Sequence, residues 1–372
     1  MMETNYRPTK AIIDLTAIDH NVRALKERAG SARLMAVVKA DAYGHGVLEV
    51  ARQALKSGAS ILAVATPDEA LHLRKNEVKA EVLVLGASPV NFIQEAISRN
   101  INLTAYSLEW LQEAAKKLER VGVDSPLPIH LKFDTGMRRI GIQPEEAEEA
   151  FEFVGQHPFQ VEGLYTHFAT ADEGDNPLFL KQVERINAIK KKWNGGKLVF
   201  HVSNSAAAIM HPELAFDAVR VGISVYGIAP SAYVKREMPL ELKQAMSLET
   251  EIIHVKKVQK GETLSYGATY TCEEDEWIAT LPIGYADGLI RGLQGQEVLV
   301  DGQRMPIVGR ICMDQCMIRL PRKFPVGEKV QLLGSQQGTT ILIDEWAEKL
   351  GTIPYEIPCI LTKRIPRLYI GA

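Results

Sequence analysis

The chain has 372 residues, 46% of them hydrophobic, and a formal net charge of -3 at pH 7. One hydrophobic core rarely serves a chain of this length, so we expect two domains. Charges of both signs are interspersed without a basic tail, which argues against nucleic acid as a partner. The N-terminus is polar and no window approaches the roughly 18 apolar residues of a membrane span, so we expect a cytoplasmic protein without a membrane partner.

The cysteines Cys272, Cys312, Cys316 and Cys359 are too few and too scattered for a disulfide framework. Cys312 and Cys316 are spaced like half of a metal site, but no second pair or nearby histidine completes a tetrahedral set. We therefore expect no metal, and we interpret the cysteines as buried or site-lining thiols.

Short runs rich in Val, Ile and Leu alternate with segments of helical spacing through the first part of the chain. The runs are 34–39, 61–65, 82–86, 102–106, 129–134, 161–167, 198–202 and 217–222, and the clearest helical segments are 48–56, 67–75 and 144–154. Continuous apolar runs between helices are typical of parallel strands covered on the outside. The sequence therefore predicts an α/β fold, with a (β/α)8 TIM-type barrel over residues 11–240 and a site at the C-terminal ends of its strands.

From about residue 241 the pattern changes to alternating strands with tight turns. The expected strands are 248–258, 276–282, 297–300, 304–308, 312–320 and 329–333, with one helix at 344–350. Asp301-Gly302 and Val326-Gly327 supply turn residues of the kind that hairpins need. We expect a mainly antiparallel β domain over residues 241–372. The strand at 11–15 could pair with either domain, and residues 1–10 could pack with the second.

Polar side chains stand where several of the barrel strands end. They are Lys39 and Tyr43 after the first strand, Arg138 and Arg139 after the fifth, His167 at the sixth, Asn204 and Ser205 after the seventh, and Arg220 and Gly222 at the eighth. Because parallel strands end at one rim of a barrel, the sequence predicts a site at this rim.

Phosphate is the natural ligand for the last two of these loops. Barrel enzymes commonly bind phosphate after strands seven and eight, and Gly222-Ile223 allows close backbone approach. A simple helix cap made by Asn204 or Ser205 is the alternative. A phosphate site beside a strand-end lysine suits pyridoxal phosphate, because a buried amine can form an imine. A barrel-interior Lys39 paired with Asp41 or another acid remains the simpler interpretation.

Spaced motifs across the whole chain resemble those of alanine racemases, in the family's order. They are AVVKADAYGHG at 36–46, DTGM at 134–137, GLYTHF at 163–168, HVSNSAA at 201–207, RVGI at 220–223, SYG at 265–267, GYADG at 284–288 and GRICMD at 309–314. The likeness extends from Lys10 to Tyr369.

The resemblance implies a racemase that interconverts L-alanine and D-alanine, supplying D-alanine for bacterial cell-wall peptidoglycan. Lys39 would hold pyridoxal 5'-phosphate as an imine and act as the base for the D-enantiomer, while Tyr266 would act on the L-enantiomer. In this family the partner subunit supplies that tyrosine, so the resemblance implies a homodimer with a shared site. His167 would contact the tyrosine, and Arg220 would hold His167 and face the pyridine nitrogen. A structural salt-bridge arginine is the alternative for Arg220.

The same resemblance implies the remaining site residues. Arg139 would bind the substrate carboxylate with the backbone of Met313, although family members often have a small residue where Arg138 stands. Lys132 matches a lysine that many racemases carbamylate. The implied phosphate and cofactor contacts are Tyr43, Asn204, Ser205, Arg220, Gly222, Ile223 and Tyr355. Tyr285 and Tyr355 would narrow the entrance, and the implied access corridor is Asp172, His201, Arg291, Arg310, Cys312 and Asp314.

Three alternatives stand beside this hypothesis. Related barrel decarboxylases that use pyridoxal phosphate lack the tyrosine of Ser265-Tyr266-Gly267. A non-catalytic protein that binds pyridoxal phosphate would need neither Tyr266 nor a second domain. A broad-specificity racemase for serine or larger amino acids is opposed only by the bulk of Tyr285, Tyr355 and their neighbours.

Overall fold

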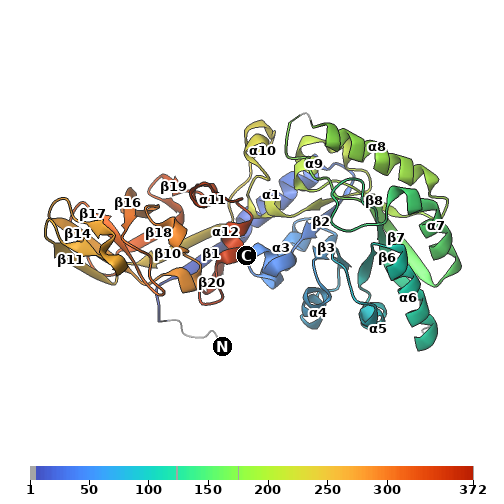
Figure 1. The fold of residues 1–372 in the computed structure, drawn as a ribbon, viewed down its shortest axis with the longest axis horizontal. Coiled ribbons are helices and arrows are strands. Elements are labelled where there is room, and N and C mark those ends of the chain that lie inside the picture. Colours follow the sequence, from blue (N-terminus) through green and yellow to red (C-terminus); the bar gives the residue numbers. More distant parts are fainter. Residues whose placement is uncertain (1–5, 123–124, 175, 372) are drawn as a thin grey trace. The chain divides into compact units, whose positions relative to one another are not determined.

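The computed structural model describes residues 6–122, 125–174 and 176–371 (Figure 1). The chain forms two compact units. The barrel unit comprises Ile18–Ala42 and Gly46–Lys243, and the β unit comprises the described residues up to Ala17, Tyr43–His45 and the described residues from Gln244 onward. Residues 1–5 of the N-terminal segment, which the sequence predicted could pack with the second domain, lie outside the described residues.

The barrel unit is built on eight parallel strands, as the sequence predicted. They are β2 (Arg33–Val37), β3 (Ile61–Val64), β4 (Glu81–Val84), β5 (Asn102–Ala105), β6 (Leu127–Lys132), β7 (Phe159–Tyr165), β8 (Val199–His201) and β9 (Ala218–Val221). From β2 to β8 each strand pairs with the next along the chain, and β2 also pairs with β9. Backbone hydrogen bonds from Asp217 N to Phe200 O (3.1 Å) and from Arg220 N to Ser203 O (2.9 Å) join β8 to β9 and close the ring.

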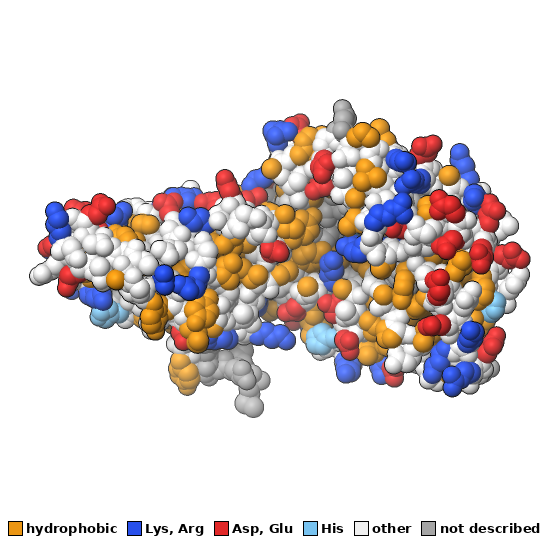
Figure 2. Space-filling model, viewed as in Figure 1, with side chains coloured by type: hydrophobic (Ala, Val, Ile, Leu, Met, Phe, Trp, Pro, Cys, Tyr) orange, Lys and Arg blue, Asp and Glu red, His pale blue; other side chains and the backbone are white. Residues whose placement is uncertain are grey.

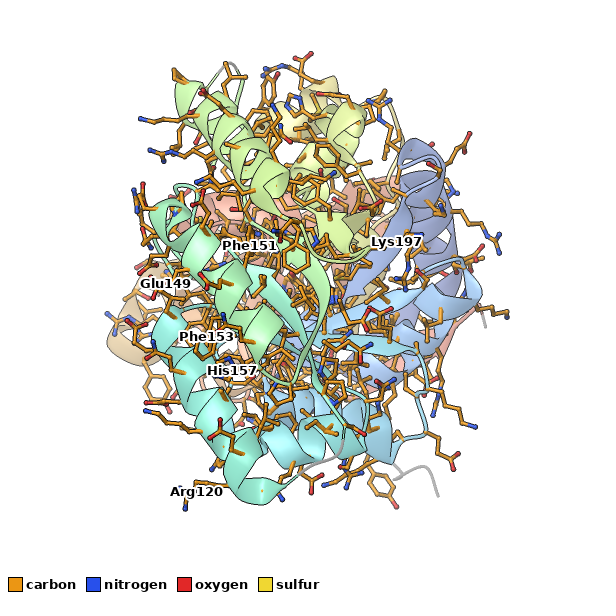
Figure 3. The ribbon with its side chains drawn as sticks, turned by 90° about the vertical axis from the view of Figure 1, so that its right-hand side faces the viewer. Arg120, Glu149, Phe151, Phe153, His157 and Lys197 are labelled. Atoms are coloured by element: carbon orange, nitrogen blue, oxygen red, sulfur yellow. The ribbon has the colours of Figure 1, made fainter. Side chains whose placement is uncertain are left out.

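Helices cover the outside of these strands (Figure 1). They are α1 (Leu15–Arg28), α3 (Val47–Lys56), α4 (Pro67–Lys75), α5 (Ile93–Ser98), α6 (Leu108–Val121), α7 (Ala147–Gln156), α8 (Pro177–Lys192), α9 (Ser205–Met210) and α10 (Ala232–Glu237). On α7, Glu149 is exposed whereas Phe151 is buried, with its ring edge-on to Phe133 at 5.7 Å; Glu149 and Phe151 are labelled in Figure 3. The visible face of the barrel unit carries charged side chains of both signs (Figure 2).

The β unit is organised around one ten-stranded sheet. Its strands are β1 (Lys10–Asp14), β10 (Met246–Glu251), β11 (His254–Val258), β14 (Glu276–Leu281), β15 (Glu297–Val300), β16 (Gln303–Val308), β17 (Cys316–Leu320), β18 (Lys329–Gln336), β19 (Thr339–Ile341) and β20 (Arg367–Ile370). Only the β1–β20 pair is parallel among the described strands of this sheet, so the predicted fold class is confirmed. A separate hairpin pairs β12 (Thr263–Leu264) with β13 (Tyr270–Thr271). The helices are α11 (Ile343–Leu350) and α12 (Glu356–Ile360).

Three details differ from the sequence-based expectations. The strand β1 pairs with β10 and β20, so it belongs to the β unit; the sequence had left its partner domain open, although the predicted barrel range began at residue 11. The run expected as one strand over 248–258 is two strands, because Ile252 N donates to Glu328 O and Ile253 N to Thr280 O, which moves the chain between neighbours. The strand expected from residue 312 begins at Cys316, because Cys312 N closes a turn onto Gln315 O.

The described residues show some global features. No described helix is both long enough and apolar enough to cross a membrane. Within the same residues, no group of three or more His, Cys, Asp or Glu side chains is arranged to hold a metal ion. The four cysteines are all free thiols.

Candidate active site

Lys39 stands two residues beyond the buried strand β2 and begins a left-handed turn. The turn is α2 (Lys39–Tyr43), in which Ala40, Asp41 and Ala42 have φ of 53–54° and ψ of 47–51°. A left-handed conformation costs a non-glycine residue about 1–2 kcal/mol, so surrounding contacts must hold this turn. One such contact is the Asp41 carboxylate, which accepts a 2.8 Å hydrogen bond from Val47 N at the start of α3.

Arg220, on β9, is fixed inside the barrel with 4% of its surface exposed. Its Nη1 donates to His201 Nδ1 (2.9 Å) and to His201 O (2.7 Å), while Nη2 donates to Thr166 O (2.7 Å). Burial lowers the pKa of the guanidinium to about 10, which still leaves it charged at neutral pH. Among the described residues no carboxylate pairs with Arg220, so its charge is available to a ligand.

A second histidine extends this contact. His130 Nδ1 lies 2.8 Å from His201 Nε2. Because an arginine can only donate, His201 Nδ1 must accept from Arg220, so His201 carries its proton on Nε2 and donates it to His130. Burial and the charge of Arg220 lower the pKa of His130 to about 3 and that of His201 far below its usual value, in agreement with two neutral rings.

A glycine on the intervening strand makes room for this pair. His130 of β6 and His201 of β8 reach across β7, where Gly163 is the residue in register with His130. A Cβ on Gly163 would lie 2.2 Å from His130 Nδ1, so a side chain there is incompatible with the contact. His130 was not among the residues expected in the site, although a polar residue two positions before Lys132 on one face of a strand was a usable signal. The resemblance implied that His201 lies in an access corridor, whereas this side chain is fully buried in the barrel.

His167, two residues beyond β7, has a pKa that is lowered by burial and by nearby cations. Burial first, then Arg220 and Arg139, hold its pKa well below the usual value, so its imidazole is neutral at pH 7. The resemblance implied that Arg220 holds His167, but the hydrogen bonds of Arg220 within the described structure go to His201 and to backbone carbonyls. The backbone of His167 is held instead by Gln182 Nε2 of α8, which donates to His167 O (3.0 Å).

Lys132, at the end of β6, is buried among cations. Burial, followed by the charges of Arg139 and Arg220, lowers its pKa to about 8, while Asp134 acts in the opposite direction. At neutral pH Lys132 therefore stays mainly charged, but its neutral amine is far more populated than that of an ordinary lysine.

The two neighbouring arginines have different surroundings. Arg138 has φ of 59° and donates from Nη1 to Gln143 Oε1 (2.9 Å). Arg139, by contrast, contributes to the lowered pKa values of both Lys132 and His167. Of the two arginines, Arg139 is therefore the one whose charge acts on both Lys132 and His167.

The loops after β8 and β9 meet through a direct hydrogen bond. Gly222 N donates to Ser205 Oγ (2.9 Å), and Ile223 begins the short helix η4 (Ile223–Tyr226). The Ser205 hydroxyl can still donate its own proton. Asn204 caps α9, because its Oδ1 accepts from Ala207 N (3.0 Å) and its Nδ2 donates to Phe168 O (3.3 Å). For Asn204, the helix cap that the sequence left open as an alternative is what the structure shows.

Asp172 also lies in the barrel unit, and burial raises the pKa of its carboxyl. Its backbone oxygen accepts from Ser231 Oγ (2.6 Å) at the start of α10.

In the β unit, Tyr266 lies at the tip of the β12–β13 hairpin with 73% of its surface exposed. Left-handed backbone at Ser265 (φ 68°), Gly267 (φ 74°) and Ala268 (φ 48°) shapes this tip. Ser265 Oγ donates to Arg310 O (2.8 Å), and a Cβ on Gly267 would lie 3.2 Å from the Arg310 guanidinium. The tyrosine is thus presented from a hairpin tip that packs on Arg310.

Two further loops of the β unit lie together. Tyr285 N donates to Cys312 O and Ala286 N to Met313 O, both at 3.0 Å. These contacts place Tyr285 next to Met313, and both side chains are exposed. Asp314, in the same loop, pairs with Arg364 at 2.7 Å, and Arg291 is exposed at the start of η7 (Arg291–Leu293).

Tyr43 and Tyr355, both of the β unit, have ring centroids 6.3 Å apart. Burial raises the pKa of the Tyr43 phenol, followed by the effects of Tyr355 and Cys359. Tyr43 is therefore a neutral hydroxyl that can donate a hydrogen bond.

Comparisons with known proteins cover the whole chain. The family profile described as "Alanine racemase, N-terminal domain" matches residues 13–230, and "Alanine racemase, C-terminal domain" matches residues 245–369. A curated alanine racemase from Halalkalibacterium halodurans is 48% identical over 379 residues, covering 99% of this chain and 96% of the relative.

Solved structures show the same likeness. Alanine racemase from E. faecalis matches with a TM-score of 0.95 and 43% identity, covering 100% of both chains. The enzyme from Bacillus anthracis with bound L-Ala-P matches with a TM-score of 0.94 and 43% identity, covering 99% of this chain and 96% of that one. A histidine racemase from Leuconostoc mesenteroides has a TM-score of 0.93 at 30% identity, covering 100% of both chains.

Proposed function

The chain belongs to the alanine racemase family and is an amino-acid racemase, and from this premise we propose that it interconverts L-alanine and D-alanine by two-base proton transfer at Cα, with pyridoxal 5'-phosphate held covalently by Lys39. The observation that carries the proposal is Arg220, a buried cation without a carboxylate partner among the described residues, in the same electrostatic surroundings as Lys39 and His167. We propose further that the protein is cytoplasmic and supplies D-alanine for cell-wall peptidoglycan.

The residues present fit this cofactor in their donor chemistry. The Ser205 hydroxyl, the backbone N–H of Ile223, and the hydroxyls of Tyr43 and Tyr355 would hold the phosphate, which prefers such donors. Gly222 would contribute by orienting the Ser205 hydroxyl, because its own N–H already donates to Ser205 Oγ. Asn204 would contribute by capping α9 beneath Ser205. Arg220 would face the ring nitrogen. When bound, pyridoxal phosphate supplies an electron-withdrawing ring that stabilises negative charge at the substrate Cα.

Arg220 would tune that stabilisation. Its pKa of about 10 keeps the guanidinium charged at neutral pH, so it can donate a hydrogen bond to the ring nitrogen but leaves that nitrogen without a full proton. An aspartate in this place would favour the protonated nitrogen and a stronger withdrawal of electrons. The arginine therefore favours return of the proton to Cα over transamination.

Two groups on opposite faces would move the proton. Lys39 would take the Cα proton of D-alanine, and Tyr266 that of L-alanine. Tyr266 is exposed on the β unit, together with Tyr285 and Met313, as expected of a surface that a second copy of the chain would cover. We therefore propose a homodimer in which the partner subunit supplies Tyr266 to the site. Because the His167 imidazole is neutral, it can accept a hydrogen bond from the phenol and assist it as a base.

Arg139 would bind the substrate carboxylate, helped by the backbone of Met313 supplied across the dimer. Its neighbour Arg138 is tied to Gln143, which supports Arg139 as the arginine that serves the substrate. The lowered pKa of Lys132 favours the neutral amine, which is the form that reacts with carbon dioxide to give a carbamate. We propose that Lys132 is carbamylated and that its negative charge orients Arg139.

The entrance would select a small substrate. Tyr285 and Tyr355 would narrow it, and the proposed access corridor contains Asp172, Arg291, Arg310, Cys312 and Asp314. A histidine racemase shares this fold, so substrate choice must be tested directly and not inferred from the fold.

The deciding experiment measures the cofactor and the reaction together. The purified protein is examined for an absorbance band of a lysine-bound cofactor, then incubated with L-alanine in deuterated water while deuterated D-alanine is followed. Absence of both the band and D-alanine would refute the proposal. L-Serine is run in parallel, and turnover equal to that of alanine would replace it with a broad-specificity racemase.

A further inference from the structure

Glu69 joins the loops that follow two adjacent barrel strands. It lies in the first turn of α4, where Thr66 Oγ1 accepts from Glu69 N (3.3 Å) and the Glu69 carboxylate returns to the backbone ahead of the helix. Its Oε2 accepts from Ala65 N (2.7 Å) and Thr66 N (3.3 Å). This half of the carboxylate is an ordinary capping box.

The other oxygen of Glu69 leaves its own helix. Oε1 accepts a 2.6 Å hydrogen bond from Ala40 N, the amide directly after Lys39. The parallel register brings these loops together, because β2 pairs with β3 and Val38 N donates to Ala63 O (2.8 Å). One carboxylate therefore bridges the chain after β2 and the chain after β3.

The amide of Ala40 is where the backbone turns left-handed. Ala40 is the first residue of the turn with positive φ, and neither it nor Asp41 or Ala42 is a glycine that would adopt this conformation freely. A charged acceptor makes a stronger hydrogen bond to an amide than a neutral one does. Glu69 thus holds the strained turn at its first peptide, adjacent to Lys39.

We propose that Glu69 is a positioning residue for Lys39: its carboxylate fixes the peptide after the lysine and so sets where the lysine amine is delivered. The inference rests on the proposed role of Lys39, but the clamp itself is a property of the barrel unit alone. The sequence pattern Thr66-x-x-Glu69 announces a helix cap and does not reveal this second contact.

The chain contains a matched control. Glu345 occupies the same capping position in α11, where its Oε1 accepts from Leu342 N (3.0 Å). The Glu345 carboxylate also contacts Arg304 Nη1 at 2.7 Å. Loss of Glu345 therefore removes a helix cap and a salt bridge in the β unit, while the hydrogen bond from Ala40 N to Glu69 is kept.

The test compares Glu69→Gln with Glu345→Gln. An amide at position 69 keeps one oxygen acceptor but presents an NH2 group to the other backbone N–H donors, so it cannot satisfy both loops. Three quantities are measured in each variant: hydrogen exchange of the peptide spanning residues 34–46 in cofactor-free protein, the rate at which added pyridoxal phosphate forms the lysine-bound absorbance band, and kcat and KM for L-alanine.

For Glu69→Gln we expect faster exchange in that peptide, band formation slowed about tenfold or more, and a similar fall in kcat with KM changed little. For Glu345→Gln we expect all three quantities to stay near those of the unmodified protein, with a lower melting temperature. Normal exchange, band formation and kcat in Glu69→Gln would overturn the inference, as would equal losses in both variants.

A second variant guards against simple unfolding. Glu69→Asp keeps the charge but is one methylene shorter, so we expect its carboxylate to keep to the local amides at the start of α4 and no longer to reach Ala40 N. If Glu69→Gln does not fold, we expect Glu69→Asp to give the faster exchange and slower band formation, and normal values there would overturn the inference. If the unmodified protein forms no lysine-bound band, the proposed function fails, while the exchange measurement still tests the clamp.

Discussion

In the barrel unit Arg220 and its two histidine partners are buried and held by one another, whereas in the β unit Tyr266, Tyr285 and Met313 stand exposed on loops. Arg220, His201 and His130 are at most 4% exposed and form a continuous chain of hydrogen bonds. Tyr266 exposes 73% of its surface on a two-stranded hairpin. The barrel unit therefore holds a buried cation in place by hydrogen bonds within the same unit. The exposed Tyr266 of the β unit would be covered by a second subunit in the proposed homodimer.

The contrast has an energetic side. A buried guanidinium without a carboxylate partner is costly to the fold, so removing or reversing it changes stability as well as chemistry. An exposed tyrosine contributes little to the packing of its own unit. Substitution of the buried Arg220 should therefore change both stability and catalysis. Substitution of the exposed Tyr266 should change catalysis alone.

The largest effect should come from Tyr266→Phe. Loss of a general base typically costs about 10²–10⁴-fold in rate, so turnover of L-alanine should fall into that range. The melting temperature should stay within a degree or so, because the side chain is exposed. Steady-state kinetics and thermal unfolding measure both. Lys39→Ala is the companion variant, expected to lose the lysine-bound absorbance band that Tyr266→Phe retains. A large drop in melting temperature for Tyr266→Phe would break the comparison between the units.

Arg220→Glu should affect both catalysis and folding. The carboxylate would favour a protonated ring nitrogen, so we expect transamination products to rise relative to racemisation. The hydrogen bonds to His201 and Thr166 are also lost, and burial of a new charge should lower the melting temperature. Pyruvate release and thermal unfolding are the measurements. A variant that racemises slowly with no rise in pyruvate would contradict the proposed control of the reaction by Arg220.

Lys132 should bind carbon dioxide. With its pKa lowered to about 8, the amine should give a carbamate signal in a ¹³C NMR spectrum recorded with labelled bicarbonate. The signal should be absent in Lys132→Met, and catalytic efficiency in that variant should fall about tenfold, as expected when one charged hydrogen bond is lost. Lys132→Glu, which restores a negative charge, should recover part of the activity. An unchanged spectrum in Lys132→Met would assign the signal elsewhere.

The smallest effect at neutral pH is expected at His130, where the change appears only in acid stability. Its pKa is about 3 when folded and 6.5 in its ordinary state, so the unfolded chain binds the extra proton. The stability it contributes is complete above pH 6.5 and is lost as pH falls toward 3, by up to about 1.4 kcal/mol per pH unit. His130→Asn keeps a hydrogen-bond acceptor without this titration, so its unfolding free energy should fall less steeply between pH 6 and pH 4. Denaturant unfolding across that range is the measurement, with the exposed His72→Asn as the control.

Much of the architecture follows from local patterns. Short apolar runs such as Ile61–Val64 identify barrel strands, since strands buried on both faces carry no alternation. The strand-end positions of Lys39 and Arg220, and the order of the motifs, led to the family that the comparisons confirm. These features depend on residues close in sequence.

Other features depend on contacts that only the closed fold creates. Alanine has no preference for a left-handed backbone, so the turn at Ala40 is dictated by distant partners such as Glu69. The His130–His201 pair crosses an intervening strand and needs Gly163 beneath it. A sequence pattern can assign a residue to a strand, but it does not show which residue on a non-adjacent strand that side chain contacts.

The electrostatic surroundings of Lys132 have a consequence for how the site is filled. Three cations, Lys39, Arg139 and Arg220, lower its pKa, and Asp134 alone raises it. Without a bound anion, the positive charges of these side chains repel one another. A phosphate group, a substrate carboxylate or a carbamate would each relieve the repulsion, so loading with anions and folding stability are thermodynamically linked. Cofactor-free protein should accordingly melt at a higher temperature in phosphate than in chloride at equal ionic strength.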